Sequence, residues 1–226
     1  VRISDEMFLL NHKYYIPICE GIIRNKLDLH MWAYSRVDTV REKNLKLIKE
    51  AGINWLALGI EAGSQIVRRE TSKGSFKDTN IRSIVEMIEM NEINVIANYI
   101  VGLPEDNHST MIATMNLALE LNTAMMNVYP CQALPGSELY KKENKTGNEY
   151  IKGYEEYAFL SYESNPLPTR SLTSCDILEF RDYFWDCYFK NPGYLKKVES
   201  LFGIKQRLNV DCLLYTSDAA DELCSV

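Results

Sequence analysis

Apolar positions in the first 140 residues follow two alternating periods, and this pattern predicts strands interleaved with helices. Short runs rich in β-branched residues favour buried strands, whereas apolar residues three or four positions apart favour amphipathic helices. The predicted strands are Val1–Glu6 (a strand end), Leu27–Tyr34, Ile53–Ile60, Val95–Val101 and Met125–Ala133. The predicted helices are Met7–Lys26, Glu42–Ala51, Ser64–Glu70, Asn80–Met90 and Ser109–Leu121. The alternation predicts an α/β fold with a parallel sheet, either a barrel or an open doubly wound sheet.

Glycine, proline and capping residues mark where several of these elements begin or end. Gly52 closes the second helix, Asp78 or Thr79 is expected to cap the fourth, and Pro17 is expected to kink or split the first. The strand at Val95–Val101 ends directly in Gly102-Leu103-Pro104. A glycine in that position allows a ligand to come close to the backbone.

The character of the chain changes after Tyr140. A polar loop is predicted at Lys141–Asn148, an aromatic cluster at Tyr150–Tyr162 and an extended linker at Asn165–Thr169. Two helices are predicted to follow, Ser174–Lys190 capped by Ser174 or Thr173, and Tyr194–Phe202 closed by Gly203. We therefore expect a core domain over residues 1–140 and an aromatic, mostly helical extension over residues 141–211.

Composition narrows the class of protein. The hydrophobic fraction of 46% supports a sizeable core, and no apolar run is long enough to span a membrane. A net charge of −6 without a basic stripe argues against nucleic-acid binding. Six cysteines without regular spacing indicate reduced thiols, which predicts a cytoplasmic protein.

The two ends of the chain suggest a piece of a longer protein. The chain begins at Val1, inside a predicted strand. The segment Cys212–Glu222, CLLYTSDAADE, resembles a translated transposon-type sequencing adapter, so we expect Cys212–Val226 to be a non-native tail. The tail holds three acidic residues and no basic one, which leaves the rest of the chain nearly neutral.

Polar residues and a glycine recur just past the predicted strands, at Asp5-Glu6, Ser35-Arg36, Glu61 and Gly102. The carboxyl ends of parallel strands meet at one edge of a sheet, where ligands bind. Each residue alone is most simply a helix cap or part of a loop salt bridge, but four in the same register favour a binding site.

Histidines and cysteines give no comparable signal. His12, His30 and His108 lack metal-ligand spacing, so no metal site is predicted from them. Cys19 and Cys131 are most simply buried small hydrophobic residues.

Five segments carry a resemblance to a known family over residues 1–140. They are SDEMF, WAYSRVD, GINWLALGIEAGS, VIANYIVGLPED and a strand ending in PCQALPGSELY. In this order they resemble the middle and later part of the radical S-adenosylmethionine (SAM) enzymes, closest to the subgroup that often carries a preceding cobalamin-binding domain. The resemblance implies a partial parallel (β/α) barrel whose first βα unit, with the family's CxxxCxxC cluster loop, is missing here. A fragment of this kind should be inactive alone.

The resemblance also implies a set of site residues. Those expected to bind SAM are Ser4, Asp5, Glu6, Ser35, Arg36, Glu61, Asn98, Ile100, Gly102, Leu103 and Pro104. Those expected to face substrate are Tyr129, Gln132, Pro135 and Gly136. The family's GGE form of the second-strand motif is replaced here by Ser4-Asp5-Glu6. No catalytic residue is assigned.

The implied cofactors are SAM, a [4Fe-4S] cluster and, in methylating members, cobalamin. The implied partners are a small-molecule substrate and an electron donor such as flavodoxin or ferredoxin. Two alternatives stay open: a methylthiotransferase-like radical SAM enzyme, and a non-catalytic α/β protein that binds a small molecule.

Overall fold

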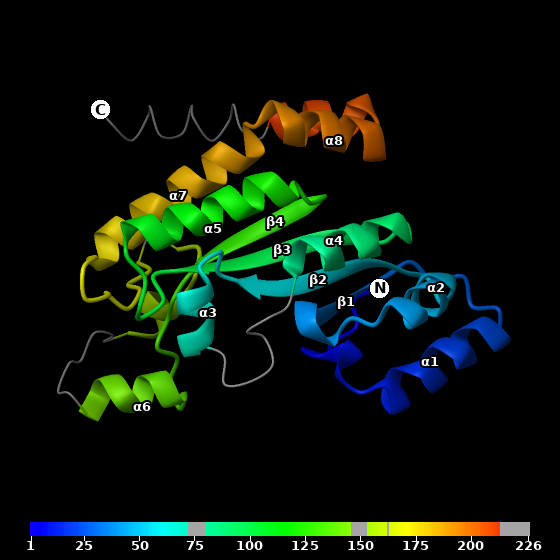
Figure 1. The fold of residues 1–226 in the computed structure, drawn as a ribbon, viewed down its shortest axis with the longest axis horizontal. Helices are drawn as coiled ribbons and strands as arrows, with labels where there is room; N and C mark the ends of the chain where they lie inside the picture. Colours follow the sequence, from blue (N-terminus) through cyan, green and yellow to red (C-terminus); the bar gives the residue numbers. More distant parts are fainter. Residues whose placement is uncertain (72–79, 146–152, 162, 213–226) are drawn as a thin grey trace.

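The sheet of this protein is parallel, as the sequence predicts. The computed structural model describes residues 1–71, 80–145, 153–161 and 163–212. Within these ranges the chain forms one sheet of four strands, β1 (Met31–Arg36), β2 (Ile53–Glu61), β3 (Asn94–Val101) and β4 (Met125–Pro130). All three strand pairs are parallel, and their order in space is their order in sequence (Figure 1). A doubly wound sheet reverses its strand order, so that alternative is wrong for the described strands, which form an unclosed sheet.

The first residues add a short parallel pairing beside β1. Arg2 forms a parallel bridge with Trp32, and the Ile3 amide donates to the Trp32 carbonyl at 3.0 Å. The predicted strand end at Val1–Glu6 is therefore present as a single bridge. The guanidinium of Arg2 also lies over the rings of Trp32 and Tyr34, 5.3 and 5.2 Å from their centroids.

Helices precede the first strand, connect the strands and follow the last one (Figure 1). Before β3 these are η1 (Phe8–Leu10), α1 (His12–Arg24), η2 (Val37–Thr39), α2 (Glu42–Glu50), α3 (Gln65–Thr71) and α4 (Ile81–Met90). Beyond β3 they are α5 (His108–Leu121), α6 (Glu138–Lys145), η4 (Tyr154–Tyr157), α7 (Ser174–Phe189) and α8 (Pro192–Phe202). Residues 204–212 are also helical. None of the helices in the described residues combines the length and apolar character that a membrane span requires.

Two predictions near the amino terminus are wrong in their boundaries. The first helix divides at Asn11, which accepts a hydrogen bond from the Lys13 amide and caps α1, whereas Pro17 lies inside α1. The strand predicted at Leu27–Tyr34 begins only at Met31 and continues through Arg36. Leu27 is exposed, so its apolar side chain does not mark the start of a buried strand.

Two further predictions need correction. The polar segment predicted as a loop at Lys141–Asn148 is helical as far as Lys145, because an exposed helix needs few apolar residues and gains from pairs such as Lys141–Glu138 at 2.7 Å. Residues 146–148 lie outside the described ranges. The N-cap of α4 is Asn80, which accepts from the Ser83 amide at 3.2 Å. The predicted caps Asp78 and Thr79 lie outside the described residues.

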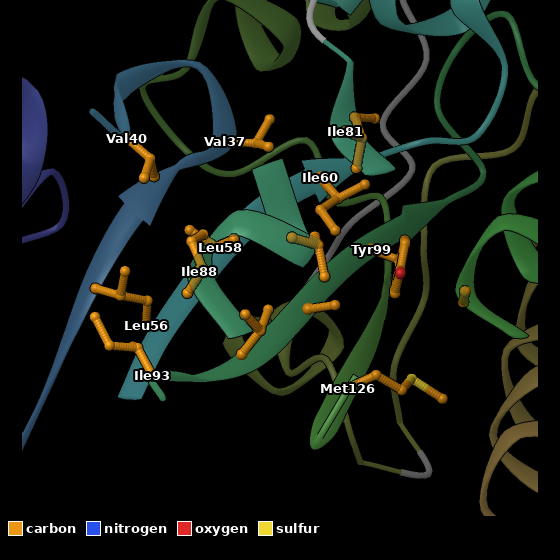
Figure 2. Close-up of a cluster of buried hydrophobic side chains, with 14 of the residues drawn as sticks. Val37, Val40, Leu56, Leu58, Ile60, Ile81, Ile88, Ile93, Tyr99 and Met126 are labelled. Atoms are coloured by element: carbon orange, nitrogen blue, oxygen red, sulfur yellow. The ribbon is translucent and has the colours of Figure 1, made fainter. Parts of the chain in front are cut away.

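Side chains alternate between the two faces of the sheet. In β3 each second residue is buried, and the residues between are partly exposed. The buried positions meet the helices: Figure 2 shows Leu58 and Ile60 of β2 gathered with Ile81 and Ile88 of α4 and with Tyr99 of β3. The opposite face carries the partly exposed positions, and we call it the open face.

The C-terminal extension packs against β3 and β4 and against the start of β2. Helix α7 packs against α5 and β4, with Phe184 5.7 Å from the Tyr99 ring. At the end of α8, Phe202 stacks on Trp55 at the start of β2, with ring centroids 5.5 Å apart. The extension therefore packs against the core and buries aromatic surface there.

Candidate functional site

Three of the predicted residues share the carboxyl edge of the sheet. Strand β1 ends at Arg36, β2 ends at Glu61, and Gly102 follows β3 directly. The parallel register pairs Arg36 with Gly59, and Gly59 with Asn98. Parallel strands in this register bring their ends to the same edge, as the sequence led us to expect.

The open face presents a row of polar side chains near this edge. Paired residues in neighbouring strands point to the same face, so Arg36, Asn98 and Asn127 lie on one line across the sheet. The Asn127 side-chain amide donates to Asn98 Oδ1 at 3.0 Å, and Asn98 in turn donates to the Leu58 carbonyl at 3.3 Å. One row closer to the edge, Ile100 pairs with Tyr129.

Glu61 takes an unusual backbone conformation that places its carboxylate over the open face. Its φ is +66°, and the register with β3 shifts between Gly59 and Glu61. A Cβ added to Gly59 would lie 2.6 Å from Glu61 Oε1 and 4.0 Å from Arg36 Cγ. The glutamate side chain therefore folds back over Gly59, beside Arg36, in space that only a glycine leaves free.

The electrostatics of this corner favour a cationic ligand. Burial raises the pKa of Glu61, and the positive charge of Arg36 opposes that rise. Arg36 is itself oriented by Asp38, whose two carboxylate oxygens accept from Arg36 Nε at 2.9 Å and Nη2 at 2.5 Å. A desolvated carboxylate of this kind is stabilised when a ligand brings a further positive charge.

Asp106 fixes the loop after β3 through two hydrogen bonds. This buried carboxylate accepts from the Leu103 amide at 3.0 Å and from the Thr110 hydroxyl at 2.6 Å. Burial raises the pKa of Asp106, and hydrogen bonds from Thr110 and from the backbone of Leu103 and Gly102 oppose the rise.

The structure gives a packing reason for a glycine at position 102. Its φ is +75°, and a Cβ there would lie 2.7 Å from Ile177 Cδ1 of α7. The left-handed backbone and the close packing on the C-terminal helix both favour a glycine here, and the approach of a ligand to it stays a prediction.

Other residues assigned to SAM binding are not brought to this corner. Ser35 is buried on the helix-covered face, where its hydroxyl lies 2.7 Å from that of Thr39. Asp5 accepts from the Met7 amide at 2.9 Å, and Ser4 and Glu6 are exposed. The Ser35 hydroxyl also donates to the Arg36 backbone carbonyl at 3.4 Å, so its contact is with the main chain of β1.

The residues assigned to substrate separate into three environments. Tyr129 lies on the open face, its ring 5.5 Å from Phe159. Gln132 is buried and donates to the Glu156 carbonyl and the Ser164 hydroxyl, both at 3.2 Å. Pro135 and Gly136 occupy the exposed turn predicted at Leu134–Ser137.

Sequence reasoning missed three polar residues of the open face and its edge. Tyr34 shares the face with Tyr129: burial raises the pKa of Tyr129, and Tyr34 adds to that rise. Asn127 and Asp38 are the other two. The signal for Asn127 was its polar side chain within an apolar strand, two residues before Tyr129 on the same face.

Metal ligands do not gather in the described part of the chain. No group of three or more His, Cys, Asp or Glu side chains there could hold a metal ion, and the sequence contains no CxxxCxxC. Cys19 and Cys131 are buried hydrophobic residues, as predicted, and burial raises their pKa values to about 11 and about 12.

The chain is similar in sequence to several enzymes. No family model matches it. It is 29% identical over 202 residues to the anaerobic magnesium-protoporphyrin IX monomethyl ester cyclase of Rubrivivax gelatinosus, which covers 87% of this chain and 36% of the relative. It is 28% identical over 141 residues to an uncharacterized methyltransferase of Pyrococcus horikoshii, covering 62% of this chain and 30% of the relative. The chain thus spans about a third of the length of these relatives.

A solved structure shares the fold. The radical S-adenosylmethionine methyltransferase TsrM from Kitasatospora setae, with cobalamin and a [4Fe-4S] cluster bound, superposes with a TM-score of 0.58. The sequence identity is 15%, and the match covers 81% of this chain and 35% of that one. This likeness shows the fold, an α/β sheet of the type found in that protein.

Proposed function

We propose that this chain, which has the fold of the radical SAM enzymes and is similar to them in sequence, forms the part of such an enzyme that binds SAM and faces the substrate. The observation that carries the proposal is the carboxyl edge of the sheet, where Arg36 and Glu61 end β1 and β2 and Gly102 follows β3. Ligands bind at this edge in parallel α/β sheets.

The residues present fit SAM. SAM carries an ammonium and a sulfonium, and the desolvated carboxylate of Glu61 is suited to bind the ammonium. Ile100 and Pro104, which are partly exposed, offer apolar surface for the adenine ring, while Asn98 supplies amide groups beside it. Burial at this corner also excludes water from the bound ligand.

The residues present do not fit a [4Fe-4S] cluster. Such clusters are held by cysteine thiolates, and Cys19 and Cys131 are buried apart from any metal-ligand group in the described residues. We propose that a CxxxCxxC segment elsewhere in the full protein holds the cluster, and that this chain alone is inactive.

The full protein is proposed to transform a small molecule by radical chemistry, with cobalamin-dependent methylation as the form to test first. This choice is supported by the subgroup resemblance in the sequence. A flavodoxin or ferredoxin is the proposed electron donor. Reduced, buried thiols and oxygen-sensitive chemistry favour the cytoplasm.

Titration calorimetry with SAM tests the binding proposal on the chain itself. Wild type should bind SAM, and Glu61→Gln, which keeps the shape and removes the charge, should bind about tenfold more weakly, or ~1.4 kcal/mol. Glu120→Gln is the matched control, because Glu120 is an exposed carboxylate on α5 paired with Arg82. Equal affinity for Glu61→Gln and wild type would contradict the assignment of Glu61.

A second experiment tests catalysis in the complete protein. After anaerobic reconstitution with iron and sulfide, it should release 5′-deoxyadenosine from SAM in the presence of a reductant. Methyl transfer that appears only when cobalamin is added would support the methylation proposal. No 5′-deoxyadenosine from a protein with an intact cluster would refute the proposed function.

A further inference from the structure

Two threonines on α5 each hold one of the loops that border the candidate site. Thr110 and Thr114 are four residues apart, so they lie on the same side of the helix about 6 Å apart along its axis. Thr110 contacts the loop after β3, and Thr114 contacts the loop after β2.

Thr114 holds the loop that follows Glu61. Its fully buried hydroxyl accepts from the Gly63 amide at 2.9 Å and donates to the Thr110 carbonyl at 3.1 Å. A Cβ on Gly63 would collide with the Ala113 carbonyl, so the loop lies directly on α5. Arg68 fixes the same loop by donating to the Gly63 carbonyl at 2.8 Å.

Thr110 holds the loop that follows Gly102. Its hydroxyl donates to Asp106 Oδ1 at 2.6 Å, and Asp106 Oδ2 accepts from the Leu103 amide at 3.0 Å. Asp106 is only 3% exposed, so these bonds are shielded from water. One rigid helix turn therefore connects the two loops through short polar contacts.

We propose that Thr110 and Thr114 form a clamp that fixes the loop after Glu61 relative to the loop after Gly102 and so positions both for SAM. The two are positioning residues, since neither lies on the open face. A helix is stiff over one turn, so a displacement at one loop is passed to the other. The binding part of this inference rests on the proposed function, whereas the coupling of the two loops does not.

The test compares three threonine variants of the chain. Thr114→Val keeps the shape and removes the hydroxyl, and Thr114→Ser keeps the hydroxyl. Thr123→Val is the matched control: Thr123 is also fully buried, and its hydroxyl donates to the Met125 carbonyl at 2.9 Å near the start of β4.

Amide hydrogen exchange measured by NMR reports the clamp without any ligand. Thr114→Val should speed exchange at Gly63 at least tenfold and also at Leu103, in the other loop. Thr114→Ser should restore slow exchange at both, and Thr123→Val should change neither. Faster exchange confined to Gly63 would overturn the clamp.

SAM titration reports the positioning. Thr114→Val should bind SAM about tenfold more weakly than wild type, with Thr114→Ser and Thr123→Val unchanged. A purely structural role predicts lower stability with unchanged affinity, and that result would overturn the positioning proposal. If wild type itself binds no SAM, the proposed function and the positioning for SAM both fail, while the exchange measurement still decides the coupling of the loops.

A variant in the loop after β3 tests the coupling from the opposite side. It also replaces Thr114→Val as the test if Thr114→Val does not fold. Asp106→Asn puts an amide group where a carboxylate oxygen accepts from Leu103 or Thr110. It should speed exchange at Gly63, which it does not touch. Unchanged exchange at Gly63 would refute the coupling.

Discussion

Replacing Gly102 with alanine should destabilise the protein by an amount that the structure allows to be divided into two parts. The backbone at Gly102 has φ +75°, where a side chain costs roughly 1–2 kcal/mol. The new methyl group would also lie 2.7 Å from Cδ1 and 2.8 Å from Cγ2 of Ile177. Overpacking of this kind costs about 1–3 kcal/mol. We therefore expect Gly102→Ala to lower the free energy of unfolding by ~2–5 kcal/mol.

A second glycine isolates the backbone part. Gly136 has φ +86°, but a Cβ there would meet nothing within 4 Å. Gly136→Ala should therefore lower the free energy of unfolding by only about 1–2 kcal/mol. Urea unfolding followed by circular dichroism measures both variants, provided that the transition is two-state.

A double-mutant cycle isolates the packing part. Ile177→Ala removes the three Ile177 atoms nearest to the new methyl group, and alone it should cost roughly 2–5 kcal/mol as a cavity. In the double variant the methyl group enters that cavity, so the combined loss should be smaller than the sum by about 1–3 kcal/mol. Additive losses, or equal losses for Gly102→Ala and Gly136→Ala, would refute the packing account of Gly102.

Two further predictions concern titratable groups. Because burial raises the folded-state pKa of Glu61, its protonated form is favoured, and its contribution to stability falls as the pH rises from the unfolded pKa through the folded one. Urea unfolding as a function of pH should therefore show the free energy of unfolding of Glu61→Gln rising relative to that of wild type as the pH rises above about 4.5. A difference between the two free energies that does not change with pH would contradict the raised pKa of Glu61. In the native state, maleimide labelling followed by mass spectrometry should modify the exposed Cys175 and Cys212 but not Cys19 or Cys131, whose pKa values burial raises to about 11 and about 12. Labelling of all four at equal rates would show that the core opens.

Local sequence signals predicted the boundaries of two elements closely. The apolar β-branched run before Gly102 predicted β3 to within one residue, and α5 begins one residue before its predicted start. Helix α6 was missed because an exposed polar helix and a polar loop have nearly the same composition.

The candidate site was predictable only in part. Arg36 and Glu61 stand at strand ends, and a parallel sheet brings such ends to one edge whatever the packing. Ser35 was assigned to the same site but lies on the opposite face, because neighbouring residues in a strand point to opposite sides. A boundary that is uncertain by one residue cannot choose between them.

The sequence by itself determined that the strands are parallel and which residues stand at their carboxyl ends, because hydrophobic period and turn residues act over a few positions. Only the tertiary structure decided that Glu61 folds over Gly59 beside Arg36, and that Gly102 packs against Ile177. These contacts join residues up to 75 positions apart along the chain. Their geometry depends on the strand register and on the position of α7 against the sheet, and a local sequence pattern contains neither.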